Sequence, residues 1–240
     1  MRVAIISDIH GNRTAFEAVL ADLRQTAPDV VLHGGDLADS GSSPVEIVDR
    51  IRELGWHGVV GNTDELLFAP EKLEQFTAQS PLAYQPMFAK IEEMAGWTRG
   101  VLGEERLGWL RGLPRIQVLD GIALVHGSRD DAWRAPGVNA SNEELEGTYL
   151  SLQQPVAVYG HIHRPYVRRT AHITVANTGS VSLSHDGDRR ASYLLADEGA
   201  LTIRRVEYEI ARELQRLRQS GLPYAEWIAR TLESGSFQMP

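Results

Sequence analysis

Potential metal ligands recur in short glycine-rich stretches along the first two thirds of the chain. Two stretches place such a residue at every second position, Asp8-x-His10 and His161-x-His163. In extended backbone, residues two apart point to the same side, so both members of each pair can reach one point. Carboxylate and amide oxygens with imidazole nitrogens suit Mn, Fe, Zn, Ni or Mg. The sequence therefore predicts a site for divalent metal ions.

Three further stretches carry the same kinds of donor. They are Gly35-Asp36-Leu37-Ala38-Asp39, Gly61-Asn62-Thr63-Asp64 and His126-Gly127. The chain has no Cys, which excludes thiolate metal sites and disulfides, so oxygen and nitrogen donors must hold any metal. A carboxylate has two oxygens and can bridge two ions.

Each of these stretches follows a predicted strand. Hydrophobic runs predict strands at 3–6, 30–32, 58–60, 122–125, 156–159 and 173–176, and helices at 14–23 and 44–54. The strand-helix alternation of the first 65 residues predicts parallel strands with right-handed crossovers. Ligand sites in open α/β sheets form beyond the carboxyl ends of the strands, so the stretches can converge at one edge.

The rest of the chain predicts helices and a hairpin. Residues 192–196 and 201–206 are typical of two strands joined at Asp197-Glu198-Gly199. We interpret residues 1–240 as one α/β domain with a helical insertion at about 66–113 and C-terminal helices at about 208–233.

The five motifs, in this order, resemble those of the calcineurin-like metallophosphoesterase family. Asn177-Thr178-Gly179-Ser180 is also similar to the Asn-Pro-Gly-Ser turn of its small bacterial and archaeal branch. The resemblance implies a four-layer αββα sandwich with two mixed β-sheets. It also implies a hydrolase that cleaves phosphate esters, above all phosphodiesters of small molecules or nucleotides.

The resemblance further implies a catalytic site with two divalent ions per chain, Mn or Fe first, with Zn, Ni or Mg as alternatives. One ion would be held by Asp8, His10, Asp36 and His163. The second would be held by Asp36, Asn62, His126 and His161. A hydroxide bridging the two ions would attack phosphorus, while the cations neutralise charge on its oxygens.

Two departures from the family pattern bear on the reaction. Thr63 stands where many members have a His that assists the leaving group, and Ser40-Gly41 follows Asp39 where protein Ser/Thr phosphatases have Arg-Gly. Both departures favour a phosphodiesterase over a phosphomonoesterase or protein phosphatase. A non-catalytic binding scaffold of the same fold is the alternative from another class, and the complete set of ligand positions weighs against it.

Other polar residues near the motifs have two interpretations each. Asp39 and Asp64 are expected to orient metal ligands or to cap turns rather than to bind metal. Asn12 either caps the helix that follows it or, with Arg13, contacts a substrate phosphate. Arg129 either reaches a phosphate or forms a surface ion pair.

The remaining histidines belong to no motif. We expect His33 in the hydrophobic core, and His57, His172 and His185 on the surface or in loops.

Charge and hydropathy narrow the class of partner. The formal net charge of -8, without a basic block, argues against a nuclease or any dedicated nucleic-acid surface. A small phosphorylated substrate remains compatible, because bound metals add local positive charge. No apolar run approaches a signal-peptide core or the roughly 20 residues of a membrane span, which predicts a cytoplasmic protein. A homo-oligomer through a strand edge or the C-terminal helices stays open.

Overall fold

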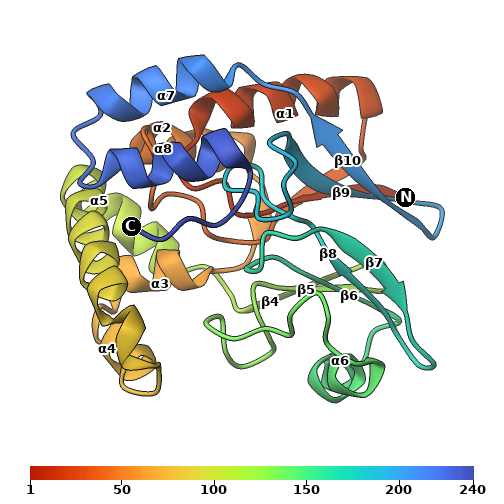
Figure 1. The fold of residues 1–240 in the computed structure, drawn as a ribbon. Helices are drawn as coiled ribbons and strands as arrows, with labels where there is room; N and C mark the ends of the chain where they lie inside the picture. The colour runs from red at the N-terminus through yellow and green to blue at the C-terminus, as the bar shows by residue number, and fades with distance from the viewer.

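Two five-stranded mixed sheets form the centre of the computed structural model, which describes residues 1–240 (Figure 1). The first sheet has the order β10-β9-β1-β2-β3 and contains β1 (Arg2–Ile6), β2 (Val30–His33), β3 (His57–Gly58), β9 (Ala191–Asp197) and β10 (Ala200–Val206). The second has the order β4-β5-β6-β8-β7 and contains β4 (Ile116–Leu119), β5 (Ile122–Val125), β6 (Val156–Tyr159), β7 (Tyr166–Arg169) and β8 (Thr174–Asn177).

Helices cover the outer faces of both sheets. They are α1 (Arg13–Thr26), α2 (Pro44–Leu54), α3 (Asn62–Phe68), α4 (Glu71–Thr77), α5 (Gln85–Arg111), α6 (Asn142–Tyr149), α7 (Ile210–Gln219) and α8 (Ala225–Ser234). Short 3-10 turns precede α5 at Leu82–Tyr84 and follow α6 at Leu150–Leu152. None of the helices has both the length and the apolar character needed to cross a membrane.

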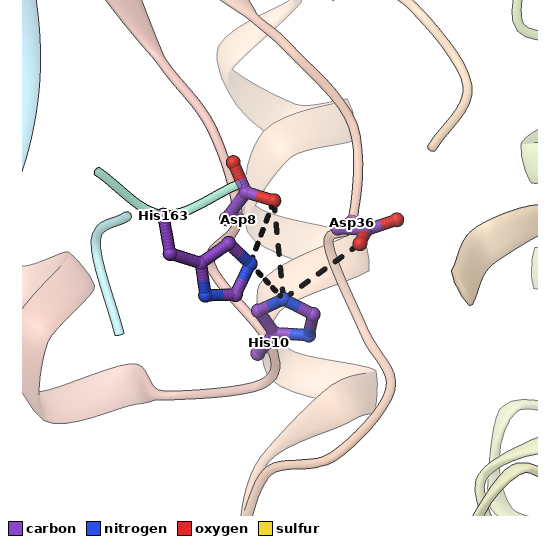
Figure 2. A group of neighbouring side chains, drawn as sticks. All are labelled: Asp8, His10, Asp36 and His163. Carbon is purple, nitrogen blue, oxygen red and sulfur yellow. Dashed lines mark hydrogen bonds and ion pairs between the residues drawn. The ribbon is translucent and has the colours of Figure 1, made fainter. Parts of the chain in front are cut away.

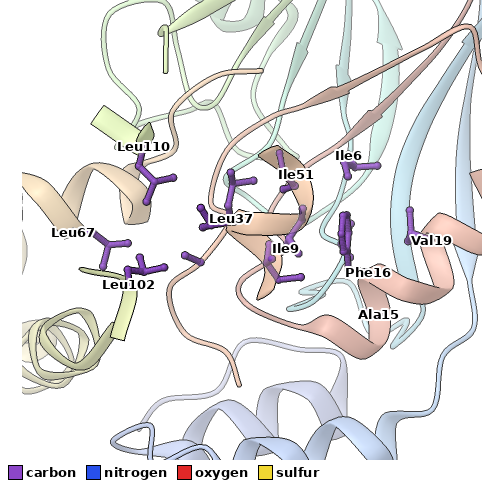
Figure 3. Close-up of a cluster of buried hydrophobic side chains, with 14 of the residues drawn as sticks. Ile6, Ile9, Ala15, Phe16, Val19, Leu37, Ile51, Leu67, Leu102 and Leu110 are labelled. Atoms are coloured by element: carbon purple, nitrogen blue, oxygen red, sulfur yellow. The ribbon is translucent and has the colours of Figure 1, made fainter. Parts of the chain in front are cut away.

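Alternation along β1 explains the layers. Val3 and Ile5 point toward the second sheet and pack in one cluster with Leu124 and Val158. The residues between and after them face the other way, and Ile6 belongs to a second cluster, which includes residues of α1, α2 and α5 (Figure 3). Each sheet thus buries its inner face against the other sheet and its outer face against helices, which confirms the expected αββα sandwich.

The strands of the first 65 residues pair in parallel, as predicted: β1 with β2 and β2 with β3. β9 and β10 form the predicted antiparallel hairpin, and β5 also pairs in parallel with β6. The third strand is shorter than expected and covers only His57–Gly58. Residues 62–111 are mainly helical, and α5 is interrupted at Gly103, whose φ of 70° is not helical.

Three elements of the structure were not predicted from the sequence. β4 and β7 are the two edges of the second sheet, and their side chains are at most half-buried. Edge strands lack the continuous apolar signal of buried ones, so their sequences look like loops. α6 is short and rich in Glu, and only Leu145 and Tyr149 mark its buried face.

Candidate metal centre

The seven candidate ligands converge at the carboxyl ends of the strands. Asp8 and His10 follow β1, Asp36 follows β2, His126 follows β5, and the His161/His163 pair follows β6. Asn62 is the first residue of α3, directly beyond the third strand of the first sheet. The site therefore lies where both sheets end, as the sequence predicts.

Four of the side chains form one compact group, drawn in Figure 2. Their ligand atoms, one each from Asp8, His10, Asp36 and His163, lie within 4.8 Å of one another, and all four residues are buried. His163 Nε2 lies 3.1 Å from Asp8 Oδ1 and 3.3 Å from His10 Nε2. His10 Nε2 lies 3.7 Å from Asp36 Oδ2.

Three more donors gather on the other side of Asp36. Asn62 Oδ1 lies 2.9 Å from His126 Nε2 and 2.9 Å from His161 Nδ1. His126 Nε2 is 3.4 Å from Asp36 Oδ2, the same oxygen that faces His10. The other oxygen of Asp36 accepts the Thr63 N–H at 2.9 Å. Asp36 therefore presents one fixed oxygen between two groups of donors.

Backbone carbonyls fix the protonation of three imidazoles. The Nδ1 atoms of His10, His126 and His163 lie 3.0, 2.7 and 2.5 Å from the carbonyl oxygens of Asp39, Gly34 and Leu183. A carbonyl can only accept, so each Nδ1 must carry a proton, and the lone pair of the neutral ring is left on Nε2. All three Nε2 atoms face the cluster, which is the arrangement that divalent cations require.

The carboxylates control the charge of these rings in the absence of a cation. Burial alone would lower the pKa of His126, but the Asp36 carboxylate outweighs it and raises that pKa to about 10. Burial likewise opposes protonation of His163, and Asp8 overcomes it and raises the pKa. By contrast, burial and the neighbouring His126 lower the pKa of His161 to about 4. The carboxylates thus attract positive charge to the site, as protons or as metal ions.

The backbone of the site is held in an unusual conformation. Five of the seven candidate ligands have positive φ, namely Asp8 (57°), His10 (45°), Asp36 (54°), His161 (66°) and His163 (55°). Each such residue costs on the order of 1 kcal/mol or more, and such strain gathers at functional sites because the surrounding structure must enforce it.

Asp64 joins the loop after β2 to the start of α3. Its carboxylate accepts N–H bonds from Asp36 at 2.7 Å, Leu37 at 2.9 Å and Gly61 at 3.1 Å. Burial and the nearby Asp36 raise its pKa to about 7, against the effect of these N–H groups. The two segments approach closely, since a Cβ on Gly35 would lie 2.4 Å from the backbone nitrogen of Gly61.

Asp39 connects the site to the helical insertion. Its carboxylate accepts from Thr98 Oγ1 of α5 at 2.7 Å and from Ser40 Oγ at 2.9 Å, while its carbonyl binds His10. Burial raises the pKa of Asp39 to about 6. Asp39 thus contacts the candidate ligand His10 directly, and Asp64 contacts the backbone of the candidate ligand Asp36.

The three candidate substrate contacts lie outside the cluster. Asn12 is buried, its Oδ1 accepts from Ala15 N at 2.9 Å as the cap of α1, and its Nδ2 donates to Ser182 Oγ. Arg13 pairs with Glu17 on the exposed side of α1. Arg129 is exposed and donates to the carbonyl of Ser151. These contacts match the capping role of Asn12 and give both arginines partners other than phosphate.

The loop that follows β8 and contains the Asn-Thr-Gly-Ser turn also contacts the site. The Asn177–Ser180 turn is tied to the ligand loops, because Asn177 Nδ2 donates to Gly160 O and Ser180 Oγ donates to Asp8 O. The same loop supplies the Leu183 carbonyl and brings His185 against His163, with ring centroids 4.5 Å apart. His185, expected on the surface or in a loop, lies in a loop and is half-buried beside the site, and no sequence pattern indicated its contact with His163.

The chain is similar in sequence and in fold to several known proteins. The sequence model of the calcineurin-like phosphoesterase superfamily domain matches residues 1–200. The chain is 28% identical to an uncharacterised protein of Methanocaldococcus jannaschii, over 97% of this chain and 98% of that protein. It is 27% identical to phosphodiesterase YfcE of Escherichia coli, over 85% of this chain and 91% of that one. A solved metallophosphoesterase of Sphaerobacter thermophilus has a TM-score of 0.80 and 28% identity, covering 98% of this chain and 99% of that one.

Proposed function

The chain belongs to the calcineurin-like phosphoesterase superfamily, and from this premise we propose that it hydrolyses phosphodiesters of small molecules or nucleotides with two divalent ions, manganese or iron. Hydrolysis of phosphate esters is the activity of the family. The preference for diesters is the finer part of the proposal. It is supported by the relative named as a phosphodiesterase and by Thr63, which offers no imidazole acid for a poor leaving group.

One observation carries the metal assignment. His10 Nε2 and His163 Nε2 lie 3.3 Å apart, and both rings use Nδ1–H on carbonyls, so two lone pairs face each other beside Asp8. Facing lone pairs repel unless a proton or a cation lies between them. Imidazole nitrogens with carboxylate oxygens are a donor set for borderline divalent ions, so the residues fit the metal that the family implies.

The chain's own residues prepare the reaction. Divalent cations bound here would activate a water molecule and neutralise charge on the phosphoryl oxygens. Thr63 N–H and the Asp64 carboxylate hold Asp36 and its loop in register with α3, so the ligand atoms need little rearrangement when the site fills. The buried Thr63 hydroxyl has no hydrogen-bond partner in the site. Thr63 supplies no imidazole acid at this position, which favours esters of acidic alcohols or phenols, since such groups leave without strong protonation.

The test compares two aryl esters. Metal-free protein reloaded with Mn²⁺ should hydrolyse bis(4-nitrophenyl) phosphate faster than 4-nitrophenyl phosphate. Asp36→Asn should lower the diesterase rate more than about a hundredfold, because the shared oxygen serves both donor groups. Asp120→Asn is the matched control, since Asp120 has a similar φ of 50° but lies exposed in a turn away from the cluster.

Each outcome separates the alternatives. Faster hydrolysis of the monoester would support a phosphomonoesterase in place of the diesterase. Full turnover by Asp36→Asn would contradict the metal site itself. A protein that binds manganese poorly and cleaves neither ester would support a binding scaffold of the same fold.

A further inference from the structure

A line of aromatic rings leads from the metal centre to the C-terminus. His163, a candidate ligand, stacks on His185 at 4.5 Å with 24° between the ring planes. His185 in turn meets the ring of Phe237 edge to face, at 5.6 Å and 82°. Phe237 is therefore only two ring contacts from the cluster, although it lies outside the 200 residues that the family model matches.

The loop that carries His185 is fixed to the metal centre. His185 N donates to the carbonyl of His163 at 3.2 Å, and the carbonyl of Leu183 accepts the Nδ1–H of the His163 ring. Leu183 also packs with Trp227 and Ile228 of α8. His185 is thus held in place before any substrate arrives.

The C-terminal tail, residues 235–240, is fixed on both sides of Phe237. Gly187 N donates to Gly235 O at 2.8 Å, and Trp227 Nε1 donates to Gln238 O at 2.6 Å. In Figure 1 the two termini lie on opposite sides of the molecule, and the first strand runs away from the N-terminal side. The tail is therefore attached to the loop that carries His185.

Phe237 remains 48% exposed in spite of these attachments. Met239, on the same tail, is a non-aromatic side chain with a similar exposed fraction of 49%. An apolar ring that is held still, half open to solvent and beside a phosphate-cleaving centre gives a planar group a surface to pack against. Aromatic rings favour offset-stacked or edge-to-face contacts with such a surface.

We propose that Phe237 and His185 form an aromatic wall that receives a planar aromatic group of the substrate, a nucleobase or an aryl ring, next to the phosphate. This proposal rests on the phosphodiesterase function, and it names the part of the substrate that the site selects. Phe237 is a specificity residue here and takes no part in bond cleavage.

The test measures binding rather than turnover. Phenylphosphonate and methylphosphonate, which the enzyme cannot hydrolyse, are titrated into the Mn²⁺-loaded full-length protein by calorimetry. The native protein should bind phenylphosphonate more tightly, and Phe237→Ala should lower this preference by between about 2-fold and 10-fold. Phe237→Tyr should retain the preference, and Met239→Ala is the matched control that should leave it unchanged.

The outcomes distinguish this inference from the proposed function. An unchanged preference in Phe237→Ala, or an equal loss in Met239→Ala, overturns the aromatic wall even if diesters are cleaved. Loss of the preference in Phe237→Ala alone supports the wall even if the native protein fails to cleave bis(4-nitrophenyl) phosphate. Melting temperatures of Phe237→Ala and Met239→Ala that equal the melting temperature of the native protein show that both variants remain folded.

Discussion

Individual side chains at the metal centre are positioned by main-chain atoms as much as by one another. Three imidazoles each donate an Nδ1–H hydrogen bond to a carbonyl, of Gly34, Asp39 or Leu183, and keep their Nε2 lone pairs for the site. Such partners fix the ring orientation of a metal ligand, and their loss typically lowers metal affinity by about 10- to 100-fold. His33 differs from these ligands, because it is a buried imidazole whose two ring nitrogens have no hydrogen-bond partner.

Because of the buried His33, we expect the stability of the folded protein to fall in acid. It is fully buried, both ring nitrogens lack partners, and burial, helped by His57, lowers its pKa to about 3. In the unfolded chain the pKa returns to about 6.5, so between these values the unfolded state binds one more proton and stability falls as pH falls. Between pH 7 and pH 5 this amounts to about 2 kcal/mol.

The measurement is urea unfolding of His33→Leu and the native protein at both pH values. The variant should gain about 2 kcal/mol relative to the native protein on going from pH 7 to pH 5. His172→Leu, which removes an exposed imidazole, is the control and should show no such gain. A constant difference for His33→Leu would mean that the ring is solvated in the folded state.

Residue types revealed the donors of the site but not their surroundings. Asp8-x-His10 and the other motifs could be read from the sequence because few residue types bind divalent ions. The carbonyl of Leu183 and the ring of His185 could not, since any residue has a carbonyl and an isolated histidine carries no pattern. The roles of Asn12, Arg13 and Arg129 as substrate contacts stay predictions.

Elements far apart in the chain meet at the site through a few buried polar side chains. Asp64 links α3 to the loop after β2, and Asp39 links that loop to α5 through Thr98. Since both links pass through segments that carry ligands, disturbing either should affect stability and metal binding together.

Asp64→Asn should weaken the joint between α3 and the β2 loop. The amide keeps one accepting oxygen and turns an NH₂ group toward backbone N–H donors, so at least one of three bonds is lost. We expect a loss of about 2–3 kcal/mol in unfolding free energy and about a 10- to 100-fold loss in Mn²⁺ affinity. Chemical denaturation and calorimetry measure the two, and native values for both would refute the link.

Thr98→Val should act on the site from the insertion. The change removes the hydroxyl that donates to the Asp39 carboxylate at 2.7 Å and leaves that buried group with Ser40 alone. The expected cost is about 1–3 kcal/mol in unfolding free energy. Thr77→Val, at a half-buried position where the exposed hydrogen bond of the hydroxyl stays within its own helix, should cost less than about 0.5 kcal/mol. Equal effects of the two variants would contradict the role of Thr98.

At the scale of elements, the sequence revealed what was strongly periodic. The parallel strands β1 and β2, the helix α2 and the hairpin β9–β10 follow from apolar spacing and turn residues. The edge strands β4 and β7 and the short α6 could not be predicted, because tertiary pairing rather than local pattern determines them.

The molecule as a whole places its site where two sheets end together. One cluster of apolar residues joins the sheets, another joins the first sheet to α1, α2 and α5, and a third packs α7 and α8 against Met94 and Leu183. The single domain, the cytoplasmic location and a homo-oligomer stay predictions, since no contact within one chain tests the last two.

Metal binding should stabilise the entire fold. The loops that hold strained and like-charged ligands belong to both sheets, so ions that bind only the folded chain raise its melting temperature. At a free metal concentration about 100 times the dissociation constant, the gain is about 2.7 kcal/mol, or roughly 5–10 °C for a chain of this length. Scanning calorimetry with Mn²⁺ and with a chelator measures this shift, and Asp36→Asn should lose most of it. An identical shift in Asp36→Asn would place the stabilising ions elsewhere.

The most direct measurement is anomalous diffraction from crystals grown with Mn²⁺. We predict two manganese peaks per chain, about 3.5–4 Å apart, on either side of the Asp36 oxygen that faces His10 and His126. A map with no peak among these side chains, or with manganese bound only at other sites on the protein, would contradict the account.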